Sequence, residues 1–216
     1  MFFLDTSTCV LAEASSTLLL MSHDTWIHRI ARSLVQPLAH STVTPNHITT
    51  LRLMTGVAAS GAAAIGSESW RRGAAGLFLA SLLLDRADGE LARLSNRKSA
   101  FGHRYDLVSD AIVNAFIFVG LGIGLRGGTA GLWTVPMGII AGTAVAAILW
   151  LVVRAERLAG ARAAELGDLA GFDLDDSMLA IPLLVILGLS THLLYTAAVA
   201  APLFAIFFFW RFRCYL

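Results

Sequence analysis

The sequence has few charged residues and very few cysteines, and each shortage narrows the class of protein. Only 14% of its 216 residues are charged, whereas 56% are hydrophobic and the mean hydropathy is +0.71. Soluble domains usually carry about 25% charged residues, so this composition excludes an ordinary soluble domain. Cys9 and Cys214 lie near opposite ends and match no metal or redox spacing. The chain is therefore predicted to be an all-α integral membrane protein.

Basic residues are missing from the beginning of the chain. No Lys or Arg precedes Arg29, so the positive flank of a secretory signal is absent. Residues 1–22 are therefore expected to be a poorly ordered N-terminal tail. Met21 resembles a natural beginning, and our hypothesis is that residues 1–20 derive from an upstream start codon, which N-terminal sequencing of native protein would test.

Residues 23–41 are predicted to form an amphipathic helix at the membrane interface. Apolar residues recur at helical spacing from Trp26 to Leu38, while Arg29 and Arg32 fall on the other face. Such a helix would place its cations near anionic lipid head groups. Packing against the membrane bundle is an alternative that is compatible with this position.

Residues 42–216 are predicted to form a membrane domain of six transmembrane helices, because six apolar stretches approach the roughly 20 residues that cross a bilayer. The stretches are about Ile48–Ile65, Gly73–Leu94, Tyr105–Leu125, Val135–Val153, Met178–Ser190 and Leu193–Phe209. Glycines four residues apart, at Gly120 and Gly124 and at Gly138 and Gly142, predict close helix contacts. Those contacts lie either within one chain or in a possible homodimer.

Two pairs of carboxylates stand near the ends of the second and third stretches. Asp85 and Asp88 form one pair and Asp106 and Asp110 the other, and helical residues three or four apart share one face. A basic turn between the pairs would bring them together. Carboxylate oxygens suit Mg²⁺ or Mn²⁺, and two such ions about 3.5 to 4 Å apart serve in-line displacement at phosphorus. The spacing therefore predicts a two-ion site.

The residues between the acids fit a phosphate-containing ligand. Gly89, Ala92 and Gly102 are small enough for a phosphate or a flat base to approach the helix. Arg93 has the fork geometry that binds phosphate oxygens. A solvated helix end is the alternative explanation of the acids, but ionisable groups at the end of an apolar helix are costly and usually functional.

The spacing of these residues resembles the signature of the CDP-alcohol phosphotransferases, also called class I CDP-alcohol phosphatidyltransferases. The matching residues are Asp85, Asp88, Gly89, Ala92, Arg93, Gly102, Asp106 and Asp110. The resemblance implies transfer of a substituted phosphate, typically phosphatidyl, from a CDP-linked lipid such as CDP-diacylglycerol to a polar alcohol, with release of CMP in phospholipid biosynthesis. It also implies that Asp110 takes the proton from the attacking hydroxyl.

The same resemblance suggests which residues contact the CDP group. Asn46 and Thr49 match a segment in which the family places nucleotide contacts, and Gly89, Ala92, Arg93 and Ser99 complete the predicted set. A turn and helix start at Thr44–Asn46, with Pro45 at an early helical position, is an alternative explanation of the first two.

Three arginines are candidates for binding the acceptor alcohol. Arg104, Arg154 and Arg157 would suit a phosphorylated acceptor such as inositol phosphate or glycerol phosphate. A plain basic flank of the membrane domain explains Arg154 and Arg157 equally well. The acceptor itself is not determined by the sequence.

Most Lys and Arg residues outside the spans fall on the side that carries both termini and the acids. The positive-inside tendency then places the acids on the cytoplasmic side, with a bacterial cytoplasmic membrane as the expected location. The expected partners are membrane lipid, the donor and the acceptor, and no nucleic acid.

Two rival classes share some of these features. Intramembrane prenyltransferases also hold Mg²⁺ and a diphosphate with aspartates, but their acidic motifs are far apart in sequence. A non-catalytic cation-binding membrane protein would explain the four acids and would leave Gly89, Ala92 and Arg93 without a role.

Overall fold

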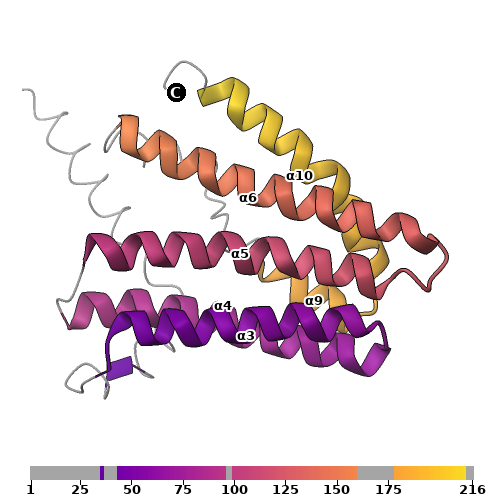
Figure 1. Cartoon of the computed structure of the whole chain (residues 1–216), viewed down its shortest axis with the longest axis horizontal. Coiled ribbons are helices and arrows are strands. Elements are labelled where there is room, and N and C mark those ends of the chain that lie inside the picture. The colour runs from indigo at the N-terminus through magenta and orange to yellow at the C-terminus, as the bar shows by residue number, and fades with distance from the viewer. Residues whose placement is uncertain (1–34, 37–42, 96–98, 160–177, 213–216) are drawn as a thin grey trace, which may run out of the picture.

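The computed structural model describes residues 35–36, 43–95, 99–159 and 178–212, and this part of the chain is helical without strands (Figure 1). The elements are α3 (Pro45–Ile65), α4 (Glu68–Leu94), α5 (Ala100–Gly124), the 3-10 turn η2 (Gly131–Trp133), α6 (Thr134–Ala159), α9 (Ala180–Ile186) and α10 (Ser190–Phe212). Helix α3 packs on both α4 and α5, α6 packs on α5 and α10, and α9 packs on α4.

Helix α3 begins and ends at residues that favour those boundaries. Pro45 occupies the first turn, where its missing N–H is not needed, and the Thr44 N–H donates to His47 Nδ1 at 3.3 Å. Gly66 ends the helix with a φ of 89°, in the left-handed region that glycine adopts without strain. The predicted helix start at Thr44–Asn46 is therefore observed.

Helices α4 and α5 are the two arms of the predicted acidic hairpin. The Ser99 hydroxyl accepts a hydrogen bond from the Gly102 N–H and caps α5. The turn before it, residues 96–98, lies outside the described residues. Both arms pack extensively on α3. A third helix therefore takes part in the acidic end of the hairpin.

The small residues predicted to make close contacts pack within the chain. A Cβ added at Gly138 would lie 2.5 Å from the Phe118 carbonyl oxygen, and one at Gly142 would lie 2.5 Å from that of Ala115. A side chain at either position would therefore force α6 away from α5. These glycines fix the α5–α6 contact inside one subunit, and the homodimer stays a prediction.

Four helical segments are long and apolar enough to cross a membrane, namely Pro45–Ile65, Ala100–Gly124, Gly131–Leu151 and Ser190–Trp210. The count of six predicted spans is not confirmed. Helix α4 is long, but ionisable residues such as Asp85, Arg86 and Asp88 reduce its mean hydropathy. Helix α9 has seven residues, about 10 Å at 1.5 Å per residue, so it does not cross the hydrocarbon core alone.

The remaining predictions about the ends of the chain cannot be compared with the fold. The N-terminal tail lies outside the described residues, as does the predicted interfacial helix apart from Val35 and Gln36. The helices that are described bury a core containing Phe78, Val113 and Leu121 and leave large apolar side chains exposed along α10. Exposed apolar side chains on long helices are what a protein surrounded by lipid requires.

Candidate functional site

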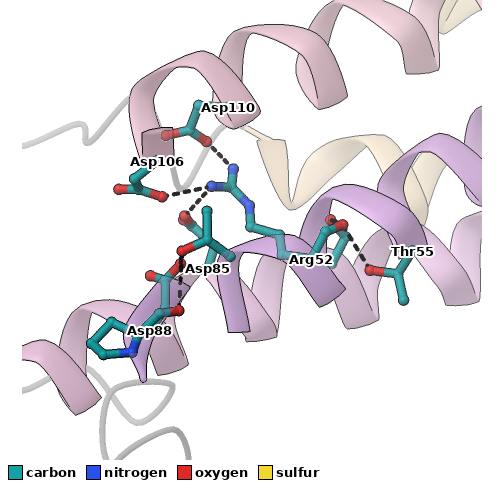
Figure 2. A network of polar contacts seen from close by, with 9 residues as sticks. Arg52, Thr55, Asp85, Asp88, Asp106 and Asp110 are labelled. Carbon is teal, nitrogen blue, oxygen red and sulfur yellow. Dashed lines mark hydrogen bonds and ion pairs between the residues drawn. The ribbon is translucent and has the colours of Figure 1, made fainter. Parts of the chain in front are cut away.

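The acids of the hairpin converge at one end of the bundle. Three of them, Asp85 and Asp88 from α4 and Asp106 from α5, each offer a carboxylate oxygen, and these oxygens all lie within 4.8 Å of one another. Asp110, one turn after Asp106, joins the same polar network through a neighbouring cation (Figure 2). The spacing rule that placed each pair on one helix face therefore holds in the folded chain.

That cation is Arg52, to which the sequence analysis assigned no function. Its guanidinium forms ion pairs with Asp85 at 2.7 Å and with Asp106 at 3.1 Å, and it also contacts Asp110. The side chain is only 1% exposed. Arg52 reaches the acids because α3 packs on both arms of the hairpin (Figure 2).

Hydroxyl groups from the neighbouring helices hold the charged groups in place. Thr49 Oγ1 donates to Asp88 Oδ2 at 2.7 Å, and Asp88 is itself buried. Ser81 Oγ of α4 donates to the Arg52 carbonyl oxygen at 3.1 Å and links α4 to α3. Burying polar groups costs the fold little stability when they are hydrogen-bonded in this way. The orientation of the acids is therefore set by α3 as well as by the hairpin.

A cavity of about 320 Å³ adjoins Asp88 and Asp106. All six residues predicted to contact the CDP group line it: Asn46, Thr49, Gly89, Ala92, Arg93 and Ser99. Three helices supply these residues, so their common position does not follow from sequence proximity. Arg93 is half exposed and contacts Glu90 at 3.1 Å. The cavity thus has carboxylates on one side and a guanidinium among its other walls.

Two glycines shape this cavity in different ways. A Cβ added at Gly102 would meet Asn46 Oδ1 at 2.9 Å and Ser99 Oγ at 3.0 Å, so Gly102 allows α3 to approach α5 there. A Cβ added at Gly89 would meet nothing within 4 Å. Gly89 therefore leaves space for a ligand, whereas a side chain at Gly102 would crowd those of Asn46 and Ser99.

The predicted acceptor residues lie elsewhere. Arg104 and Arg154 line a larger cavity of about 630 Å³ between α5 and α6, whose other walls are mainly apolar. The Arg154 guanidinium lies 5.5 Å from the centre of the Trp150 ring, within range of a cation–π contact. Arg157 belongs to α6, but its side chain lies outside the described part. None of the four acids lines this second cavity.

Asn114 is a second buried polar residue that the sequence analysis missed. It follows Asp110 by one turn, is 4% exposed, and its Oδ1 has no hydrogen-bond partner. A small space of about 10 Å³, room for roughly one water molecule, lies beside Asp85, Asp110 and Asn114. Its place one turn beyond Asp110 in an apolar helix could have identified Asn114 from the sequence.

The donor set fits a hard divalent cation. Three carboxylates within 4.8 Å supply only oxygen ligands, as Mg²⁺ and Mn²⁺ prefer. Asp110 is not part of that close group, and it pairs with the Arg52 guanidinium, which also pairs with Asp85 and Asp106. The geometry therefore accommodates an ion at Asp85, Asp88 and Asp106.

These features combine helices of membrane-spanning length and composition with an aspartate cluster able to hold a cation, beside a cavity that Arg93 lines. A family model described as CDP-alcohol phosphatidyltransferase matches residues 42–210, and the chain belongs to this family. The family resemblance seen in the aspartate spacing is thereby confirmed. None of the curated proteins compared with the chain matches it.

Membership in the family gives the activity in outline. The protein is a membrane transferase of phospholipid biosynthesis that moves a phosphatidyl group from a CDP-alcohol to an alcohol acceptor. Members of the family generally use divalent metal ions, and the cluster of three aspartates is able to bind one.

Proposed function

We propose that this protein transfers a phosphatidyl group from CDP-diacylglycerol, or a closely related CDP-linked lipid, to the hydroxyl of a small polar alcohol and releases CMP. The observation that carries this proposal is the convergence of Asp85, Asp88, Asp106 and Asp110 beside the cavity lined by Gly89 and Arg93. At such a site, the carboxylates can bind a diphosphate through a bound cation, and the arginine can bind its phosphate oxygens directly.

The four aspartates would hold Mg²⁺ or Mn²⁺, two ions in our proposal, which supply positive charge against the diphosphate when bound. The acceptor oxygen forms a new bond to the phosphorus that carries the diacylglycerol, and the bond from that phosphorus to the CMP oxygen breaks. Asp110 takes the proton of the attacking hydroxyl, and CMP leaves with the bonding electrons. A carboxylate suffices as base where the hydroxyl is already polarised.

The cavity of about 320 Å³ is proposed to bind the CDP group. Arg93 is positioned to bind a phosphate, and Gly89 leaves the space that a base or ribose needs. The Asn46 amide offers both donors and acceptors to a cytosine or ribose. Thr49 contributes indirectly, because its hydroxyl already donates to Asp88.

Arg104, Arg154 and Arg157 stay our prediction for contacts to an anionic acceptor. Arg104 belongs to the first turns of α5, at the same end of the bundle as the acids but on the helix face opposite Asp106. The positive-inside tendency places this end of the bundle on the cytoplasmic side, where water-soluble CMP is released. The lipid tails of the donor would stay in the bilayer.

The test is release of CMP by purified protein in detergent or lipid nanodiscs. CDP-diacylglycerol is supplied with Mg²⁺ or Mn²⁺ and a panel of alcohols that includes glycerol phosphate, inositol phosphate and serine. We expect CMP to appear with at least one acceptor and only when a divalent ion is present. CMP release with none of the acceptors, from protein that is folded and binds Mn²⁺, would contradict the proposal and favour a non-catalytic cation-binding protein.

A further inference from the structure

Arg52 neutralises the acidic site from within the protein. It is 1% exposed, and three carboxylates surround it. A buried guanidinium without partners would be very costly, and so would four clustered carboxylates without a cation. Each group therefore depends on the other when no divalent ion is bound.

The four acids do not share Arg52 equally. Arg52 Nη1 pairs with Asp85 and Asp106, two members of the close group of oxygens, whereas Nη2 pairs with Asp110, which lies outside that group. Asp88 is held by Thr49. Each carboxylate has two oxygens, so one ion can bind among Asp85, Asp88 and Asp106 while Arg52 Nη2 stays on Asp110. A second ion would need Asp110, and the guanidinium already occupies that side of the site.

We propose that Arg52 is a resident counter-cation that competes with the second divalent ion for Asp110. This rests on the two-ion site of the proposed function. In the resting protein one ion binds tightly and Arg52 balances the rest of the negative charge. Arg52 must leave Asp110 before that carboxylate can serve a second ion or accept a proton. Arg52 is thus a positioning residue, because it acts on the reaction through Asp110.

Two buried polar atoms in this region, on Arg52 and Asn114, lack partners. The Arg52 Nε is buried and has no hydrogen-bond partner, so the observed arrangement does not satisfy the whole guanidinium. The small space beside Asp85, Asp110 and Asn114 adjoins the same acids. The Asn114 Oδ1, which also lacks a partner, is an acceptor that borders this space.

The experiment measures Mn²⁺ binding and thermal unfolding in protein stripped of metal ions. Free Mn²⁺ is followed by electron paramagnetic resonance, and the melting temperature Tm is recorded with EDTA and with Mn²⁺. The variants are Arg52→Gln, Arg52→Lys and the double variant Arg52→Gln/Asp110→Asn. Arg126→Gln is the control, because it removes one positive charge from an exposed position after α5.

We expect one tight Mn²⁺ ion in the wild type and two in Arg52→Gln, with the second ion bound about tenfold or more tightly than in the wild type. The Tm of Arg52→Gln in EDTA should be lower than that of the wild type, and Mn²⁺ should raise it by more degrees. Arg52→Lys keeps the charge and should keep one tight ion. The double variant should recover the Tm in EDTA and return to one tight ion, and Arg126→Gln should match the wild type.

Two tight ions in the wild type, or an unchanged count and affinity in Arg52→Gln, would overturn the proposal. If Arg52→Gln does not fold, the double variant is the test. The proposal is also overturned if adding Asp110→Asn to Arg52→Gln does not restore folding in EDTA. These readouts need no turnover. Absence of CMP release with the expected Mn²⁺ results would count against the proposed function alone, and CMP release with an unchanged Mn²⁺ count would count against the role of Arg52 alone.

Discussion

The two faces of α5 border cavities of opposite character. Asp106 and Asp110 lie one turn apart on one face, next to α3, and Asp106 lines the smaller cavity. Arg104, Val108 and Ala115 lie on the other, along the larger cavity. The first is polar and lined by three helices, whereas the second is mainly apolar and is formed by α5 and α6. One face of α5 therefore carries the acidic residues, and the opposite face borders a mainly apolar cavity.

The reason for the difference lies in what packs on each face. On the acidic side, α3 brings hydroxyls and Arg52 to the carboxylates. On the other side, Gly138 and Gly142 hold α6 close to Ala115 and Phe118, and the cavity extends from Ala115 toward Arg104. In Figure 1, α6 diverges from α5 toward the end where α6 finishes. Helices α5 and α6 are thus close at Gly138 and Gly142 and leave space between them further along.

The largest effect should come from the acidic face. Asp110→Asn removes the proposed base and a negatively charged ligand while keeping the size of the side chain. We expect CMP release to fall by about 10²- to 10⁴-fold. The Tm should fall by no more than a few degrees, because Arg52 loses one charged partner but keeps its ion pairs with Asp85 and Asp106. Full activity in this variant would rule out Asp110 as the base.

A smaller effect should follow from filling the smaller cavity. Gly89→Leu places a side chain where an added Cβ meets nothing within 4 Å, so the fold should tolerate it while the CDP group loses its space. We expect the KM for CDP-diacylglycerol to rise about tenfold, as the loss of one good polar contact or of equivalent space would cause.

The matched control is Gly76→Leu. Gly76 belongs to the same helix, and a Cβ there also meets nothing within 4 Å, but it does not line the smaller cavity. Both variants should gain similar helix propensity. Equal KM values for the two variants would mean that the donor does not occupy the cavity beside Gly89.

The larger cavity should have a more modest influence. Arg104→Ala is expected to raise the KM for an anionic acceptor about threefold to tenfold, because one charge-assisted contact is lost. The KM for the CDP-linked donor should not change. Arg126→Ala removes the same charge from a position outside this cavity and serves as the control. If neither KM changes, the second face of α5 takes no part in acceptor binding.

The smallest effect is expected in the turn of the hairpin. Lys98→Ala alters a residue predicted to lie between α4 and α5, outside the described residues. We expect less than about a twofold change in CMP release, because Lys98 is predicted to lie in the turn and not in the site. A loss comparable to that of Asp110→Asn would show that the turn belongs to the active site.

Much of the acidic face could be predicted because the acids of each pair lie only three or four residues apart in the sequence. The pairs Asp85 and Asp88, and Asp106 and Asp110, follow from helical periodicity. The predicted CDP residues come together around one cavity, although their role is still a proposal. The family itself followed from the spacing of the motif and was confirmed.

Other parts depended on packing that the spacing does not specify. Arg52 lies 33 residues before Asp85, and only the insertion of α3 against both arms of the hairpin brings it to the acids. Its position three residues after the buried Thr49 was a usable signal, because a charged residue on the buried face of an apolar helix needs a partner. The fifth predicted span, about Met178–Ser190, contains α9, but this helix has only seven residues, because hydropathy alone does not show where a helix ends.

The Ser99 hydroxyl has one further consequence. Its oxygen accepts the Gly102 N–H that begins α5, while its own proton is still available to a molecule in the adjoining cavity. A nucleotide that accepts this proton would polarise the hydroxyl and strengthen the bond that starts the helix. Occupancy of the cavity would then be transmitted along α5 as firmer winding of its first turn, one turn before Asp106.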